Sequence, residues 1–274
     1  MTRQALVPDR SGMPGFGLGT WQNEDPDACA ESVRTALEAG YRHVDTAQIY
    51  GNEAAVGRGI AAADVDREDV FLATKVWIDS LGHDDVLGST EESLEKLGTE
   101  YVDLLYVHWP AGEYDPEATL SAFEELREAG TIDRIGVSNF EPSHVETAQS
   151  VVDAPIFANQ VEMHPLLPQR ELRAFCADAG VELVAYSPLA RGDVFDVDVL
   201  SEIADDRGVS EAQVSLAWLR AKGVTPIPKA TGADHIRDNW ASLELELTDD
   251  EVGRIDDIDA ERRKVDPDFA PAAW

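Results

Sequence analysis

Basic residues are scarce in this chain, and lysine is the scarcest of the common charged types. The 274 residues include 54 acidic and 22 basic side chains, giving a formal net charge of −32, and only five of the basic residues are Lys. A polyanion of this strength is repelled by nucleic acid and by anionic membranes, so neither is expected as a partner. The acidic residues are spread along the whole chain, which indicates a solvated surface whose self-repulsion salt would screen. We therefore expect a halophilic protein.

Cysteines and long apolar runs are also rare. Cys29 and Cys176 each lie in an amphipathic helical pattern without a second Cys nearby, which predicts two small core residues. The six His have no metal-binding spacing, so no metal site is expected. No apolar run reaches the roughly 20 residues of a membrane helix, and the first residues lack the apolar core of a signal peptide. We expect a soluble, cytoplasmic protein, and a monomer.

Short apolar runs alternate with helical patterns, and no linker divides the chain. Asp25-Pro26 and Asp115-Pro116 each fit an N-cap followed by Pro at the first helical position, and Gly40 fits a helix stop. The runs that predict strands are residues 15–18, 41–44, 70–74, 104–107, 135–137, 156–158, 183–185 and 224–227. Buried strands separated by helices predict a parallel sheet closed into a (β/α)8 TIM barrel, formed by residues 1–274 as one domain.

Two segments fall outside this repeat. Thr248 and Glu251 form a capping-box pattern, which predicts an extra helix near residues 248–259. Residues 265–274 are an irregular C-terminal tail. An open, doubly wound sheet is the alternative fold, but the early glycines do not follow the G-x-G-x-x-G spacing that a dinucleotide-binding strand would show.

The polar residues with the most chemical content stand at the ends of predicted strands. Asp45, Lys75 and His108 each end a different strand, and Tyr50 follows Asp45 in a turn closed by Gly51. In this kind of barrel the carboxyl ends of the strands form the catalytic face. Each residue has an ordinary structural explanation alone, such as a helix cap or a core imidazole. Together they indicate a proton-donating site.

The four side chains fit the reduction of a carbonyl group. A free phenol has a pKa near 10, which is high for a donor at neutral pH, and a nearby ammonium would lower it. We expect Lys75 to supply that charge, Asp45 to hold Lys75, and neutral His108 to orient a substrate carbonyl by a hydrogen bond. Tyr50 would then protonate the oxygen while a hydride reaches the carbon. This chemistry requires a hydride donor.

Over nearly its whole length the sequence resembles the aldo-keto reductases, and most closely the bacterial diketogluconate reductases and other small-carbonyl reductases. The stretch from Gly40 to Gly57 is similar to the first signature of that family. The other similar stretches are residues 13–21, 135–140, 159–162, 186–189 and 227–229.

The resemblance implies roles for individual residues. Tyr50 is the general acid, tuned by Lys75 and Asp45, with His108 aligning the carbonyl. Tyr186 stacks on the nicotinamide ring. The other residues implied in cofactor binding are Thr20, Trp21, Ser138, Asn139, Gln160, Ser187, Leu189, Lys229, His235, Asp238 and Asn239. The candidate walls of the substrate pocket are Trp21, Trp77, Trp109 and Trp274.

The cofactor expected from the resemblance is NADPH, with NADH as an alternative. Many members follow the late Ile-Pro-Lys motif with Ser and place Arg six residues after the Lys, whereas this chain keeps Lys229 and has Ala230 and His235 there. The loss of a hydroxyl and a guanidinium predicts a weaker grip on the 2′-phosphate. Short connections after His108 and Tyr186 predict an open pocket for small aldehydes, α-dicarbonyls or keto-sugars.

Two other functions compete with this interpretation. A Schiff-base aldolase would use Lys75 as a nucleophile, although an adjacent Asp45 would keep the amine protonated. A regulatory subunit on the same fold would bind the cofactor with little turnover. Borohydride trapping on Lys75 would identify the aldolase, and cofactor binding without aldehyde reduction would identify the regulatory subunit.

Overall fold

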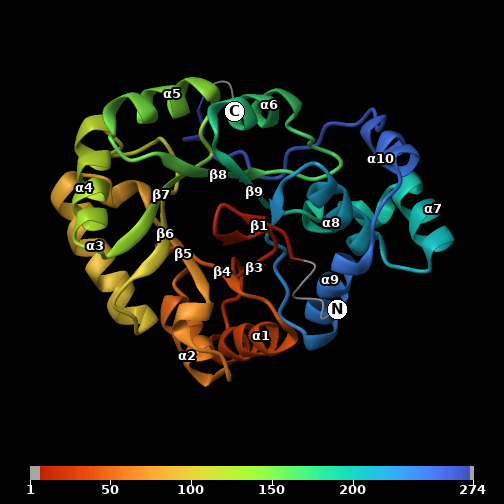
Figure 1. Cartoon of the computed structure of the whole chain (residues 1–274), viewed down its shortest axis with the longest axis horizontal. Coiled ribbons are helices and arrows are strands. Elements are labelled where there is room, and N and C mark those ends of the chain that lie inside the picture. The colour runs from red at the N-terminus through yellow and green to blue at the C-terminus, as the bar shows by residue number, and fades with distance from the viewer. Residues whose placement is uncertain (1–6, 272–274) are drawn as a thin grey trace.

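Eight parallel strands form the centre of the molecule in the computed structural model, which describes residues 7–271 (Figure 1). Along the chain the strands are β3 (Leu18–Gly19), β4 (His43–Asp45), β5 (Phe71–Val76), β6 (Val102–Val107), β7 (Ile132–Ser138), β8 (Ile156–Glu162), β9 (Glu182–Tyr186) and β10 (Thr225–Pro226). Each strand pairs with the next one in the sequence. The first strand lies slightly later than the predicted residues 15–18.

Main-chain contacts between β3 and β10 close the sheet. The N–H of Gly17 donates to the carbonyl of Pro226 at 3.0 Å, and the N–H of Gly19 donates to that of Pro228 at 3.2 Å. A Cβ at position 19 would lie 2.7 Å from the carbonyl oxygen of Ile227, so the two strands can approach this closely only with glycine. The prediction of a (β/α)8 barrel is therefore confirmed, and the open-sheet alternative is wrong.

Helices surround the strands on the outside of the barrel (Figure 1). They are α1 (Pro26–Ala39), α2 (Glu53–Ala62), α3 (His83–Leu97), α4 (Pro116–Glu128), α5 (Pro142–Val151), α6 (Arg170–Ala179), α8 (Glu211–Ala221) and α9 (Ala233–Ala241). The predicted punctuation is confirmed for α1, where the Asp25 side chain accepts from two backbone N–H groups and Gly40 ends the helix with a φ of 118°. Within the described residues, no helix has the length and apolar character needed to cross a bilayer.

Two further helices pack beside each other outside this ring (Figure 1). The predicted extra helix is α10 (Asp249–Asp256), and its Thr248–Glu251 capping box is present. The other, α7 (Asp198–Arg207), was not predicted. Arg207 of α7 binds both carboxylate oxygens of Glu251 at 2.7 Å. A short hairpin of β1 (Asp9–Arg10) and β2 (Met13–Pro14) brings Met13 onto the residues that fill the barrel interior.

Close packing of α2 against α3 explains why residue 57, in the stretch from Gly40 to Gly57, is a glycine. A Cβ on Gly57 of α2 would lie 2.3 Å from the backbone oxygen of Leu97 at the end of α3. Gly88, in the middle of α3, has no atom within 4 Å of the same hypothetical Cβ. One glycine therefore permits contact between two helices, while the other only weakens its own helix.

We predict opposite effects of Ala at these two positions. Gly57→Ala should lower the free energy of unfolding by about 1–3 kcal/mol, because α2 must move away from α3. Gly88→Ala should raise it by about 0.5–1 kcal/mol, because alanine restricts the unfolded chain and favours helix. Denaturant titration of both variants measures the two shifts. Equal effects would contradict the close approach of α2 to α3.

Candidate active site

The four predicted catalytic residues come together at the carboxyl ends of the strands. Asp45 ends β4, Lys75 lies one residue before the end of β5, and His108 directly follows β6. Tyr50 ends a 3₁₀ turn that precedes α2. Asp45, Tyr50 and His108 line a cavity of about 550 Å³, and Lys75 is fully buried against them.

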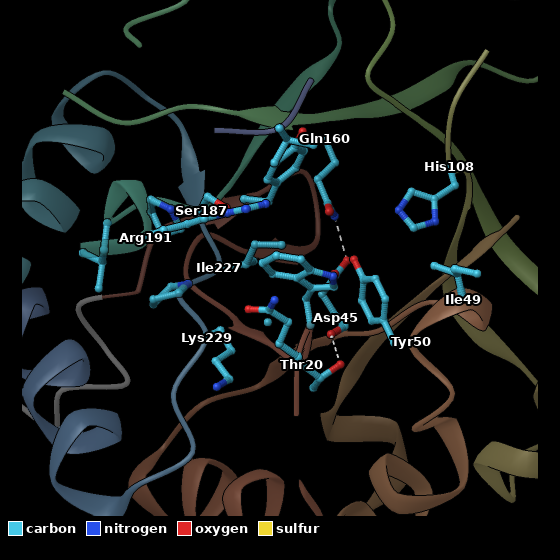
Figure 2. Close-up of a pocket in the computed structure, with 18 of the residues that line it drawn as sticks. Thr20, Asp45, Ile49, Tyr50, His108, Gln160, Ser187, Arg191, Ile227 and Lys229 are labelled. Atoms are coloured by element: carbon cyan, nitrogen blue, oxygen red, sulfur yellow. Dashed lines mark hydrogen bonds between the residues drawn. The ribbon is translucent and has the colours of Figure 1, made fainter. Parts of the chain in front are cut away.

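The Lys75 ammonium is the centre of the hydrogen-bond network. Its Nζ donates to Asp45 Oδ1 at 2.5 Å, to the carbonyl of Thr46 at 2.8 Å and to the Tyr50 hydroxyl at 3.4 Å. These three bonds use all the donors of a lysine. The second Asp45 oxygen accepts from Gln160 Nε2 at 2.7 Å, a contact that Figure 2 shows and that the sequence did not predict. The network fixes the lysine beside the phenol.

Burial controls the protonation of Tyr50. Removal of the phenol from water raises the pKa of Tyr50 well above 10.0, and the Asp45 carboxylate and Tyr186 raise it further. The expected net lowering of this pKa is therefore wrong, because desolvation is the largest cause and the Asp45 carboxylate acts in the same direction. Burial also lowers the pKa of Lys75, against the opposing effect of Asp45. Tyr50 consequently keeps its proton at neutral pH.

His108 lies between two aromatic rings. The imidazole meets Tyr50 edge to face with ring centroids 5.8 Å apart, and Trp77 in the same way at 5.0 Å. Burial lowers the pKa of His108 well below 6.5, and the Lys75 charge adds to the effect. Its Nδ1 has no hydrogen-bond partner within residues 7–271. A neutral imidazole thus faces the cavity next to the phenol.

One flat side of the cavity is formed by Tyr186. Its hydroxyl donates to Asn139 Oδ1 at 2.9 Å, and Asn139 Nδ2 donates to the carbonyl of His108 at 3.0 Å. Ser138 and Asn139 are buried and do not line the cavity, and Ser138 Oγ donates to the carbonyl of Gln160 at 2.8 Å. The predicted cofactor residues that do line it are Thr20, Trp21, Gln160, Tyr186, Ser187, Leu189 and Lys229.

Three predicted cofactor residues lie outside the cavity lining, on α9. His235 is exposed, and Asn239 is buried. Asp238 accepts hydrogen bonds from Ser210 Oγ and Gln213 Nε2, both at 2.6 Å, so its carboxylate already ties α9 to α8. A contact with the adenosine end of a cofactor stays a prediction for all three residues.

The connection after Tyr186 is longer than predicted and adds a cation to the site. It runs from residue 187 to 197 and contains the 3₁₀ segment η5 (Ala190–Asp196). Three non-glycine residues in it have left-handed backbone, Ser187 (φ 48°), Ala190 (φ 49°) and Arg191 (φ 54°). The Arg191 guanidinium stacks over the Trp21 ring, 4.4 Å from its centroid. Sequence reasoning missed Arg191, although only Ala190 separates it from the recognised Tyr-Ser-Pro-Leu stretch.

The two sides of the cavity differ in charge. Arg191 and Lys229 lie on the side opposite Ile49 and His108, as Figure 2 shows. No ion pair holds Arg191 or Lys229 within the described part of the chain, although acidic residues greatly outnumber basic ones. Two such cations beside the flat face of Tyr186 fit an anionic dinucleotide. Among residues 7–271, no group of three or more His, Cys, Asp or Glu side chains is arranged to hold a metal ion.

The remaining wall is aromatic and aliphatic. The predicted pocket residues Trp21, Trp77 and Trp109 all line the cavity, and Trp274 lies outside the described residues. Three further apolar residues at the cavity were missed, and they are also the large hydrophobic side chains with the greatest exposure: Ile49, Phe195 and Phe269.

Comparison with known proteins identifies the family of this chain. Residues 12–260 match the model of the Aldo/keto reductase family. The chain belongs to this family. It is similar to the glyoxal reductase of Bacillus subtilis (strain 168), with 41% identity over 92% of this chain and 91% of that protein.

Solved structures agree with this assignment. One provisionally assigned as a 2,5-diketo-D-gluconic acid reductase B has a TM-score of 0.93 and 37% identity, over 98% of this chain and 96% of that one. An aldo-keto reductase of Bombyx mori in complex with NADP has a TM-score of 0.87 and 33% identity, over 93% and 92% of the two chains. The chain is therefore an NAD(P)H-dependent reductase of the aldo-keto reductase family.

The low pKa of His108 predicts how reductase activity depends on pH. The ring stays neutral at and below pH 6.5, so kcat/KM for a carbonyl substrate should be flat between about pH 6 and about pH 8. Initial rates of cofactor oxidation across this range measure the profile. A titration near pH 6.5 that disappears in His108→Gln would contradict the prediction, because it would show that His108 is solvated.

Proposed function

We propose that this enzyme reduces small aldehydes, α-dicarbonyls or keto-sugars with NADPH, and that Tyr50 is the general acid. The observation that carries the proposal is the contact of the Lys75 ammonium with both Asp45, at 2.5 Å, and the Tyr50 hydroxyl, at 3.4 Å. The cavity beside this contact also presents neutral His108. The name of the glyoxal reductase supports the α-dicarbonyl class.

The mechanism follows from where charge appears during reduction. A nicotinamide held beside Tyr186 would supply the hydride to the carbonyl carbon. Tyr50 and His108 can both donate hydrogen bonds to the carbonyl oxygen, and they polarise it before transfer. Tyr50 then gives its proton to the oxygen as negative charge develops there. The phenolate left behind is stabilised by the Lys75 ammonium, which Asp45 and Thr46 hold in place.

The buried lysine does not fit the aldolase alternative. Lys75 has no exposed surface, and its three hydrogen bonds occupy the amine. A substrate carbonyl would have to displace Asp45 before it could reach the nitrogen. The regulatory-subunit alternative has no support from the reductases to which the chain is similar.

The cation pattern supports NADPH over NADH with modest discrimination. Lys229 is exposed at the cavity without an ion pair among the described residues, so it can receive the 2′-phosphate. Ala230 is buried and offers no hydroxyl, and exposed His235 replaces the guanidinium that would bind phosphate in a bidentate manner. One point charge remains where the family often has three contacts.

We also infer a monomeric, cytoplasmic protein adapted to high salt. The large apolar side chains that are exposed among residues 7–271 all line the cavity, so no separate apolar patch is left for self-association. Both cysteines are free and buried. The net charge of −32 supports the adaptation to salt.

Removal of the proton donor should abolish reduction. Tyr50→Phe should lower kcat by at least about 10²–10⁴-fold, because a catalytic acid commonly contributes that much, while NADPH still binds. Cofactor oxidation followed at 340 nm gives the rate, and fluorescence titration gives the cofactor affinity. Tyr114→Phe is the matched control, since its hydroxyl has no partner in the described chain. Near-normal turnover of Tyr50→Phe would refute the mechanism.

Cofactor preference should depend on Lys229. Lys229→Ala should remove most of the preference, measured as the ratio of kcat/KM for NADPH to that for NADH, and His235→Arg should increase it about tenfold or more by adding a bidentate phosphate contact. Lys96→Ala, on the surface of α3 with a Glu92 partner, is the control and should leave the ratio unchanged. An unchanged ratio in Lys229→Ala would show that the phosphate site is elsewhere.

Salt should stabilise the fold. The melting temperature should rise by several degrees or more from dilute buffer to molar KCl, because a Debye length of about 3 Å at 1 M screens repulsion between carboxylates. Circular dichroism at several KCl concentrations measures the change. A melting temperature that is independent of salt would exclude the proposed adaptation.

A further inference from the structure

The segment that follows α10 crosses the mouth of the cavity. We call residues 262–269 the C-terminal strap. Val265, Pro267 and Phe269 line the cavity, and no helix or strand includes them. The Phe269 ring packs edge-on against Trp77, with centroids 5.8 Å apart, and against Trp109 at 5.5 Å. Because regular secondary structure does not fix the strap, its place over the two tryptophans depends on other contacts.

Glu162, the last residue of β8, supplies the strongest of these contacts. One carboxylate oxygen accepts from the backbone N–H of Lys264 and the other from that of Val265, both at 2.8 Å. His164 Nε2 lies 2.9 Å from the first oxygen. Glu162 and His164 are fully buried, so these are charge-assisted bonds shielded from water. A buried carboxylate thus holds the main chain of the strap.

The same strand organises the catalytic centre. Gln160 stands two residues before Glu162, on the same face of β8, and binds Asp45. Glu162 is also the register partner of Tyr186, whose ring lines the cavity. One rigid strand therefore sets the positions of the proton-donating network and of the strap relative to each other.

A second, weaker tie reaches the strap from the loop beside the cavity. Asp193 of η5 forms ion pairs with Lys264 and with Arg262, the latter at 3.4 Å. The three side chains remain partly exposed to water, where an ion pair contributes little to stability and is screened by salt. The buried Glu162 contact does not share this sensitivity.

We propose that Glu162 is a positioning residue that fixes the strap so that Phe269 forms the outer wall of the substrate pocket. This wall favours carbonyl substrates with a flat apolar group long enough to reach Phe269. The rings that Phe269 contacts at this wall are those of Trp77 and Trp109, which offer flat apolar faces to such a group. The inference rests on the proposed carbonyl reduction.

The test compares two aldehydes of different reach. Naphthaldehyde extends to the strap, whereas methylglyoxal is too small to do so. In Glu162→Gln the amide cannot accept from both strap N–H groups, so the ratio of kcat/KM for naphthaldehyde to that for methylglyoxal should fall about tenfold, mainly through KM. Glu182→Gln, on the adjacent strand β9 with Ser11 as its partner, should keep the wild-type ratio.

Phe269→Ala identifies the route of the effect. It should lower the same ratio by a similar factor, and the double variant Glu162→Gln/Phe269→Ala should lower it no further, because both changes remove one wall. Additive losses, or a ratio that Glu162→Gln leaves unchanged, would overturn the proposal. If the wild-type enzyme reduced neither aldehyde, the proposed function would fail instead.

Two variants keep the test decisive if Glu162→Gln does not fold. Glu162→Asp retains the charge on a shorter side chain and should give the same selective loss. Asp193→Asn should give a smaller loss that disappears in molar KCl, whereas the loss in the Glu162 variants should persist there. Wild-type selectivity in Glu162→Asp, or a loss in it that salt removes, would show that the buried carboxylate does not position the strap.

Discussion

The structure of the active site depends on one buried ion pair, between Lys75 and Asp45. Both side chains are buried, so the donors and acceptors of the pair need partners within the protein. Lys75 therefore also binds Thr46 and Tyr50, and Asp45 also binds Gln160. The need to compensate two buried charges ties the ends of β4, β5 and β8 together, and it places the phenol next to the ammonium.

The distribution of charge separates the surface from the site. Several of the few cations stand in ion pairs on the surface, as Arg34 does with Glu31 and Arg254 with Glu202. Arg191 and Lys229 instead remain at the cavity without such partners within residues 7–271. In a chain with a net charge of −32, two cations on one wall that form no ion pair favour an anion beside that wall.

Sequence patterns predicted most of the barrel because strand runs and helix caps are local signals. The Asp25 and Thr248 caps lie where they were expected, since each cap depends on a few neighbouring residues. The candidate catalytic residues were predictable because the carboxyl ends of all the parallel strands lie on the same face of a barrel. Phe269 and Glu162 were not, because their contacts join residues that are a hundred or more positions apart. The predicted direction of the Tyr50 pKa shift was wrong, because the sequence shows which charges are near the phenol but not how deeply the phenol is buried.

The loop that carries Arg191 has a further thermodynamic consequence. Left-handed backbone at Ser187, Ala190 and Arg191 costs on the order of 1–3 kcal/mol per residue and persists only because the surrounding structure enforces it. The shape of this loop therefore reduces the stability of the folded protein, and contacts with the rest of the chain, such as that of Arg191 with the Trp21 ring, must offset the cost.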